Sequence, residues 1–147
     1  MSFNLTDEDL SLIYSKAETC LFDGNRIKFE FDRKWSSNFP KKSGVYAIYE
    51  GIDLLYIGET ANLKERMKEV KRTYNHSFRK KLGKYRFGGV EIVKGKYSDT
   101  IENQMNDFYR EKLYMSYIEV NFGRIEIESF LISKYQEILL NSQKLRK

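Results

Sequence analysis

The sequence has few of the side chains that bind metals through sulfur or nitrogen. Its 147 residues include one cysteine, Cys20, and one histidine, His76. A single cysteine excludes an internal disulfide, and the two residues together cannot form a thiolate or imidazole cage. Any metal ion is therefore expected to have oxygen ligands. We expect no small-molecule cofactor beside it.

Long apolar runs are also missing. No stretch approaches the roughly 20 residues that cross a bilayer, and the first residues lack the basic and apolar regions of a signal peptide. We therefore expect a cytoplasmic protein without a membrane partner. The length and mixed composition predict one folded domain over residues 1–147.

Positive charge is in modest excess, but it is concentrated. The net charge is +5, whereas residues 61–88 alone carry ten lysines and arginines against two glutamates, so the rest of the chain is net negative. Such a segment could follow a phosphate backbone. The alternative is a solvated helix face. The candidate DNA-binding residues are Lys64, Lys71, Arg72, Arg79, Lys80 and Lys81.

Hydrophobic periodicity predicts alternating helices and strands. Thr6 and Asp9 can cap a helix that reaches about Leu21, and residues 27–31 alternate as a half-buried strand does. Two β-rich runs in residues 44–58 predict a hairpin. Further elements are expected as helices near 62–70, 77–82, 99–112 and 124–136, and as strands near 89–93 and 113–120. The order predicts an α/β (α+β) fold, a small and mainly antiparallel sheet flanked by helices.

Two short motifs stand on the predicted hairpin. Gly44-Val45-Tyr46 is followed by Tyr56-Ile57-Gly58, and an ordered block continues from Tyr56 to Arg66. Together these resemble the defining motifs of the GIY-YIG nuclease superfamily. The resemblance covers about residues 43–141, the expected nuclease core, and leaves residues 1–42 as an N-terminal extension. It implies a compact, stand-alone nuclease, similar to a restriction endonuclease.

The family places a glutamate on a later helix and an asparagine after it. Glu128 and Asn141 match these positions. The separation between them is about one residue longer than the family's usual spacing, and the usual proline is missing. Glu126 competes with Glu128. On a helix Glu128 shares a face with Leu131, and Glu126 lies about 200° away, so the helical geometry favours Glu128.

The resemblance implies a metal-dependent DNA endonuclease. Glu128 would hold one Mg²⁺ or Mn²⁺ ion and Arg66 would grip the scissile phosphate. Tyr46 would be the general base or the residue that orients water, which requires neighbouring cations to lower its pKa. Tyr56 would support it or bind the phosphate.

Several alternatives remain open at this level. His76 can share the proton transfer or be a surface residue that touches a phosphate, and Lys71, Arg72 or Lys80 could fill its place. The protein could also be an inactive DNA-binding module of the same fold. A double-strand cut would need either a homodimer or two successive nicks.

Overall fold

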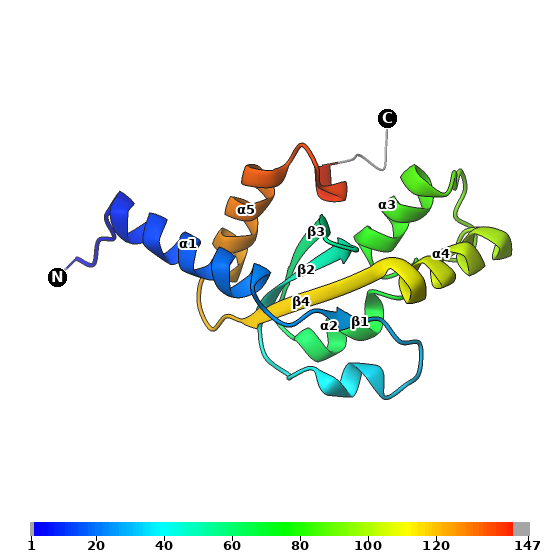
Figure 1. Ribbon diagram of the computed structural model, residues 1–147, viewed down its shortest axis with the longest axis horizontal. Helices are drawn as coiled ribbons and strands as arrows, with labels where there is room; N and C mark the ends of the chain where they lie inside the picture. The colour runs from blue at the N-terminus through cyan, green and yellow to red at the C-terminus, as the bar shows by residue number, and fades with distance from the viewer. Residues whose placement is uncertain (1, 143–147) are drawn as a thin grey trace.

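The computed structural model describes residues 2–142 and contains a four-stranded sheet with helices on both faces (Figure 1). Its strands are β1 (Ile27–Lys28), β2 (Gly44–Glu50), β3 (Asp53–Thr60) and β4 (Leu113–Glu119), in the order β1-β4-β2-β3. All neighbours are antiparallel. The predicted α+β architecture is confirmed, and β3 lies at an edge of the sheet.

The β2–β3 hairpin sets the positions of the two motif tyrosines. Tyr46 pairs with Gly58 and Ile48 pairs with Tyr56. Residues directly opposite each other in an antiparallel pair project to the same face. Both tyrosines therefore lie on one face of the sheet. The hairpin register shifts after Ile48, which leaves Leu55 unpaired as a bulge.

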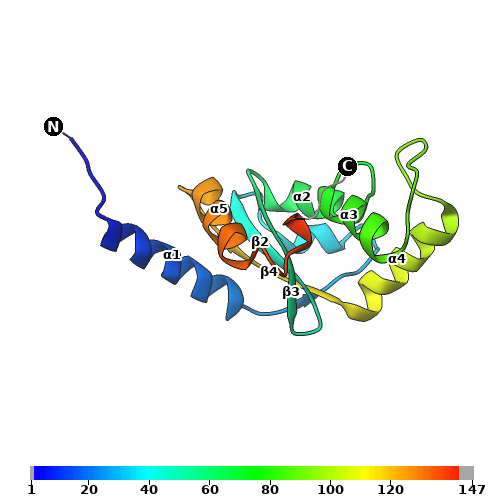
Figure 2. The same ribbon diagram turned by 90° about the horizontal axis from the view of Figure 1, so that it is seen from above.

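One face of the sheet is covered by the first and last long helices, α1 (Asp7–Phe22) and α5 (Arg124–Tyr135) (Figures 1 and 2). The predicted Thr6 cap is present as a capping box with Asp9. Beneath these helices, a buried apolar cluster joins the inward residues of the helices to one side of β2 and β3, and includes Leu21, Val45, Ala47, Tyr49, Ile57, Ile127 and Leu131.

The opposite face carries the motif tyrosines and is covered by four helical segments. These are the 3-10 helix η1 (Trp35–Asn38) and the helices α2 (Leu63–Glu69), α3 (Ser77–Arg86) and α4 (Asp99–Lys112). Aromatic rings dominate this cluster, with Phe78 packed against both Tyr56 and Tyr109. None of the helices among residues 2–142 is long and apolar enough to span a membrane.

Two predicted strands differ from the structure. The strand expected over residues 27–31 ends at Lys28. Residues 89–93 form no strand, because Val90 is 98% exposed and packs against no sheet, and Val93 makes only an isolated bridge to Lys96. The bridge closes a tight turn in which Lys94 and Gly95 have positive φ angles.

Arg79, predicted as a DNA-binding residue, is instead buried beneath α4. Its Nη2 lies 3.1 Å from a Glu102 carboxylate oxygen, and its Nε donates to the Thr73 hydroxyl at 3.1 Å. Nη2 also donates to Asn106 at 2.8 Å. A guanidinium that is 1% exposed cannot reach a nucleic acid. The prediction of a phosphate contact for Arg79 is therefore wrong, and the residue joins α3 to α4.

Arg79→Ala should destabilise the protein by about 3 to 5 kcal/mol, because it leaves the Glu102 carboxylate partly buried without its partner. Urea unfolding would measure the loss. Lys80→Ala is the matched control, since the neighbouring side chain is half-exposed, and it should change stability by less than about 0.5 kcal/mol. Equal stability of the two variants would contradict a structural role for the Arg79 ion pair.

Candidate active site

The site begins with the contact between Tyr46 and Gly58 across the hairpin. Tyr46 is fully buried, and its ring lies directly over the glycine. A Cβ atom at Gly58 would overlap the ring carbons and the hydroxyl of Tyr46. Glycine is therefore required at this position by the approach of the ring, although its φ angle is not positive.

His76 holds the hydroxyl of Tyr46. It is the N-cap residue of α3, and its Nδ1 accepts a hydrogen bond from the backbone N–H of Phe78 at 3.0 Å. Because that nitrogen must keep its lone pair, the ring proton resides on Nε2. Nε2 lies 2.7 Å from the Tyr46 hydroxyl oxygen and thus donates to it. Burial, with Arg66 nearby, lowers the pKa of His76 well below its ordinary value, so the ring is neutral.

Arg66 reaches the same oxygen from α2. Its Nε donates to the Tyr46 hydroxyl at 3.4 Å, and its Nη1 donates to Glu69 at 3.3 Å and to the Asn75 carbonyl at 3.4 Å. These bonds are long, and the side chain is 26% exposed. The guanidinium is thus oriented by the protein and still open to a ligand.

Tyr56 lies beside Tyr46 and His76. Its ring centroid is 6.4 Å from that of Tyr46 and 5.7 Å from that of His76. Burial raises the pKa of Tyr56 to about 12 and raises that of Tyr46 further, because a buried phenolate loses its hydration. Contrary to the expectation from sequence, the neighbouring cation does not lower the pKa of Tyr46 below its ordinary value.

Glu128 approaches the two tyrosines from α5, while Glu126 on the same helix is exposed to solvent. Glu128 is half-buried, and burial together with the nearby Glu59 carboxylate raises its pKa to about 7, against the opposing effects of a backbone hydrogen bond from Glu59 and of Arg66. Within residues 2–142 Glu128 has no ion-pair partner, whereas Glu59 is paired with Arg124 at 2.7 Å. The sequence reasoning missed Glu59 and Arg124, although Glu59 follows Gly58 within the motif block.

Asn141 supports the strand that carries Tyr56. Its Oδ1 accepts from the Ile57 N–H at 2.9 Å, and its Nδ2 donates to the Ile57 carbonyl at 2.7 Å. The side chain thereby satisfies the outward backbone groups of an edge strand. Lys81 donates in turn to the Asn141 carbonyl at 2.6 Å. The side chain of Asn141 is thus engaged with the backbone of β3, and its predicted catalytic role stays a prediction.

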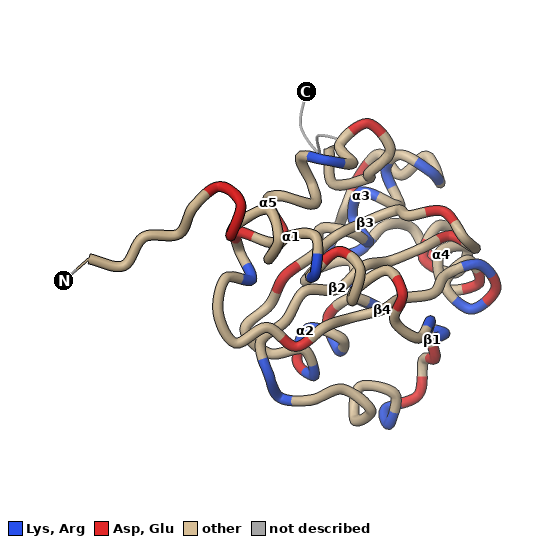
Figure 3. Tube along the Cα trace, turned by 60° about the vertical axis from the view of Figure 1, so that its left-hand side comes forward, with Lys and Arg blue, Asp and Glu red and all other residues tan. Residues whose placement is uncertain are grey.

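The remaining predicted DNA-binding residues lie on α2, on α3 and in the turn between them. Figure 3 marks the lysine and arginine positions along the chain in blue. Arg72 is exposed, and the side chains of Lys64, Lys71 and Lys80 are half-exposed. Of the aromatic residues in this segment, Tyr74 is 72% exposed, whereas Phe87 packs against Phe108.

The donor set suits one hard cation. Among residues 2–142 no three histidine, cysteine, aspartate or glutamate side chains form a metal-binding cluster. Glu128 supplies a single carboxylate near the phenols and Arg66, and within residues 2–142 it forms no ion pair. Mg²⁺ is commonly held by one or two carboxylates and keeps several water ligands. The residues present therefore fit such an ion.

Comparison with known families agrees with this geometry. A sequence model of the GIY-YIG catalytic domain matches residues 26–147. The chain therefore belongs to this family of nucleases, as its motifs predicted. The match starts before the hairpin and includes β1. A search of curated proteins and a search of solved structures gave no match.

Glu128→Gln should stabilise the metal-free protein at pH 8 and have little effect at pH 4. With its pKa raised from 4.5 to about 7, native Glu128 keeps a proton that the unfolded chain has lost, so its contribution to stability falls as the pH rises between these values. The gain at pH 8 should be on the order of 1 to 2 kcal/mol, once partial exposure is allowed for.

Thermal unfolding at both pH values would measure this difference. Glu126→Gln is the control, because Glu126 lies on the same helix and is exposed, and it should leave stability unchanged at either pH. A loss of stability in Glu128→Gln at pH 8 would show that the native carboxylate is satisfied by the protein.

Proposed function

We propose that the protein is a metal-dependent DNA endonuclease that hydrolyses phosphodiester bonds at the site formed by Tyr46, Tyr56, Arg66 and Glu128. The observation that carries this proposal is the convergence of two hydrogen-bond donors, His76 and Arg66, on the buried oxygen of Tyr46, with the unpaired carboxylate of Glu128 close by. Membership of a nuclease family supports the reaction class.

Arg66 is the residue proposed to hold the scissile phosphate. Phosphoryl transfer depends mainly on positioning and on neutralising the charge of the phosphoryl oxygens. The guanidinium can donate two parallel hydrogen bonds to a phosphate and stays charged at every relevant pH. Its contacts with Glu69 and the Asn75 carbonyl fix its orientation before the substrate arrives.

Glu128 is proposed to bind one Mg²⁺ or Mn²⁺ ion. When bound, such an ion stabilises negative charge on the phosphoryl and leaving oxygens. The carboxylate must be ionised to accept a cation. With its pKa near 7, metal binding competes with a proton around neutral pH.

Tyr46 is proposed to orient the attacking water. Hydrogen bonds from His76 and Arg66 favour negative charge on its oxygen, but burial outweighs them and keeps the hydroxyl protonated. Tyr46 thus acts through its hydroxyl rather than as a preformed base. His76 is a positioning residue, because Nε2 already donates to Tyr46 and Nδ1 is occupied by the Phe78 N–H.

The surface proposed to bind DNA includes Lys64, Lys71, Arg72 and Lys80. They lie on α2, on α3 and in the turn between them, close in sequence to Arg66 and His76, so a phosphate backbone crossing the site would pass close to them. Lys81 is proposed to act mainly through its contact with Asn141.

Arg66→Ala and Glu128→Ala should each reduce plasmid nicking in Mg²⁺ or Mn²⁺ by at least about 100-fold, because each removes charge stabilisation of the transition state. Glu126→Ala, on the same helix but exposed, should cut as the wild type does. Equal cutting by all four proteins would refute the site. A wild-type protein that binds DNA without cutting would instead indicate an inactive recognition module.

Tyr46→Phe should lower the single-turnover cleavage rate by about 100-fold or more, since it removes the hydroxyl proposed to orient water. Tyr49→Phe is the matched control. It deletes another buried tyrosine hydroxyl from β2, one that bonds to Ser116 at 2.8 Å on the opposite face of the sheet. Single-turnover cleavage of a labelled duplex would compare the two. Similar rates for both variants would exclude a direct role for Tyr46.

A further inference from the structure

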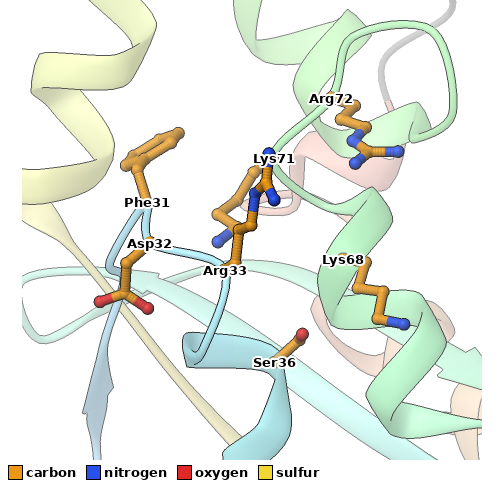
Figure 4. Close-up of a pocket in the computed structure, with 7 residues that line it drawn as sticks. All are labelled: Phe31, Asp32, Arg33, Ser36, Lys68, Lys71 and Arg72. Carbon is orange, nitrogen blue, oxygen red and sulfur yellow. The ribbon is translucent and has the colours of Figure 1, made fainter.

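A basic groove lies outside the active site (Figure 4). It runs between residues 31–36, which we call the N-terminal segment, and the end of α2 with the turn that follows it. It has a volume of about 530 Å³. A smaller hollow of about 320 Å³ shares three of its lining residues, Phe31, Lys71 and Arg72, and extends it toward the turn at Lys94. We define the basic groove by its six surface cations, Arg33, Lys68, Lys71, Arg72, Lys94 and Lys96.

The groove is strongly positive. Two carboxylates line it, those of Asp32 and Glu102, and Glu102 is neutralised by the buried Arg79. Among the described residues Arg33, Arg72 and Lys94 form no ion pair. Their charges are therefore available to an anionic partner.

Contacts of the N-terminal segment hold the groove in shape. Lys71 Nζ donates to the Glu30 carbonyl at 2.7 Å and lies 4.6 Å from the centroid of the Trp35 ring. Phe31 packs against Tyr109 of α4 at 5.8 Å between ring centroids. The segment is thus held by Lys71, just after α2, and by Tyr109 of α4, and Arg33 lies between its two contact residues, Phe31 and Trp35.

The turn between α2 and α3 contributes residues to both the groove and the active site. It places Arg72 in the groove and His76 beside Tyr46. Between them, the Asn75 carbonyl accepts from Arg66. A ligand that occupied both places would cross this turn, so the ligand has to be extended.

The shape favours a polyanion over a small molecule. Small-molecule sites enclose most of their ligand in a largely apolar cavity. This groove is instead open, and long cationic side chains line it from three places: residues 31–36, the end of α2 with the turn after it, and the turn at Lys94. Lysine and arginine side chains gathered in an open groove can neutralise the phosphates of a nucleic acid.

We propose that the basic groove binds the phosphate backbone of duplex DNA beside the scissile phosphate, and so gives the N-terminal segment a role in substrate binding. This inference rests on the proposed function in taking DNA as the substrate. The phosphate contacts would be independent of base sequence and would set the register of the duplex on the active site.

Charge reversal in the N-terminal segment and in the turn at Lys94 tests the proposal. Binding of the metal-free protein of 147 residues to a labelled 30-base-pair duplex would be measured by fluorescence anisotropy across NaCl concentrations. Arg33→Glu and Lys94→Glu should each weaken binding several-fold, and the double variant should weaken it by about tenfold or more and reduce the salt slope by about two. The KM for DNA cleavage should rise in parallel.

Lys16→Glu is the matched control, since it makes the same change of charge at an exposed position of α1, outside the groove. It should leave affinity and salt slope close to wild type. If Arg33→Glu and Lys94→Glu behave like Lys16→Glu while the wild type cuts DNA, the groove proposal is overturned and the proposed function stands. If the wild type neither binds nor cuts DNA, both are overturned.

Discussion

The close approach of the Tyr46 ring to the backbone at Gly58 is the constraint on which the rest of the site depends. With the ring packed against Gly58 of β3, the hydroxyl lies within hydrogen-bond distance of His76 from α3 and Arg66 from α2. His76 is the N-cap residue of α3, and Arg66 lies in the last turn of the short helix α2, which Asn62 caps. A side chain at position 58 would displace the ring and separate the phenol from both donors.

Electrostatics at the site oppose folding and favour a ligand. The structure buries two phenols and a neutral histidine, and it half-buries Glu128. Among residues 2–142 this carboxylate has no ion-pair partner, whereas Glu59 is paired with Arg124. A second arginine near Glu128 would satisfy it and stabilise the fold, but it would also occupy the place where we propose that a metal ion binds. Without such a residue, burial and the Glu59 carboxylate keep the pKa of Glu128 raised.

Elements that depend on local pattern were predictable from sequence. The Thr6 capping box, the hairpin at residues 44–58 and the basic helices follow from spacing within a few residues. Features that depend on contacts with other elements could not be predicted from the sequence. Arg79 lies among exposed basic residues in sequence, and its burial requires Glu102, Thr73 and Asn106 from elsewhere. Asn141 likewise meets Ile57 across 84 residues, which no local pattern reveals.

The candidate active site combines both kinds of information. The motif spacing places Tyr46 and Tyr56 on one face of the hairpin, and helical geometry favours Glu128 over Glu126. The protonation state of His76 was beyond that reasoning, because it depends on the Phe78 N–H that fixes the ring. Since the cap commits Nδ1 as an acceptor, the histidine can only donate to Tyr46. The N-cap hydrogen bond that starts α3 therefore sets the direction of the His76–Tyr46 hydrogen bond in the candidate site. The position of the imidazole proton thus depends on the folding of this helix.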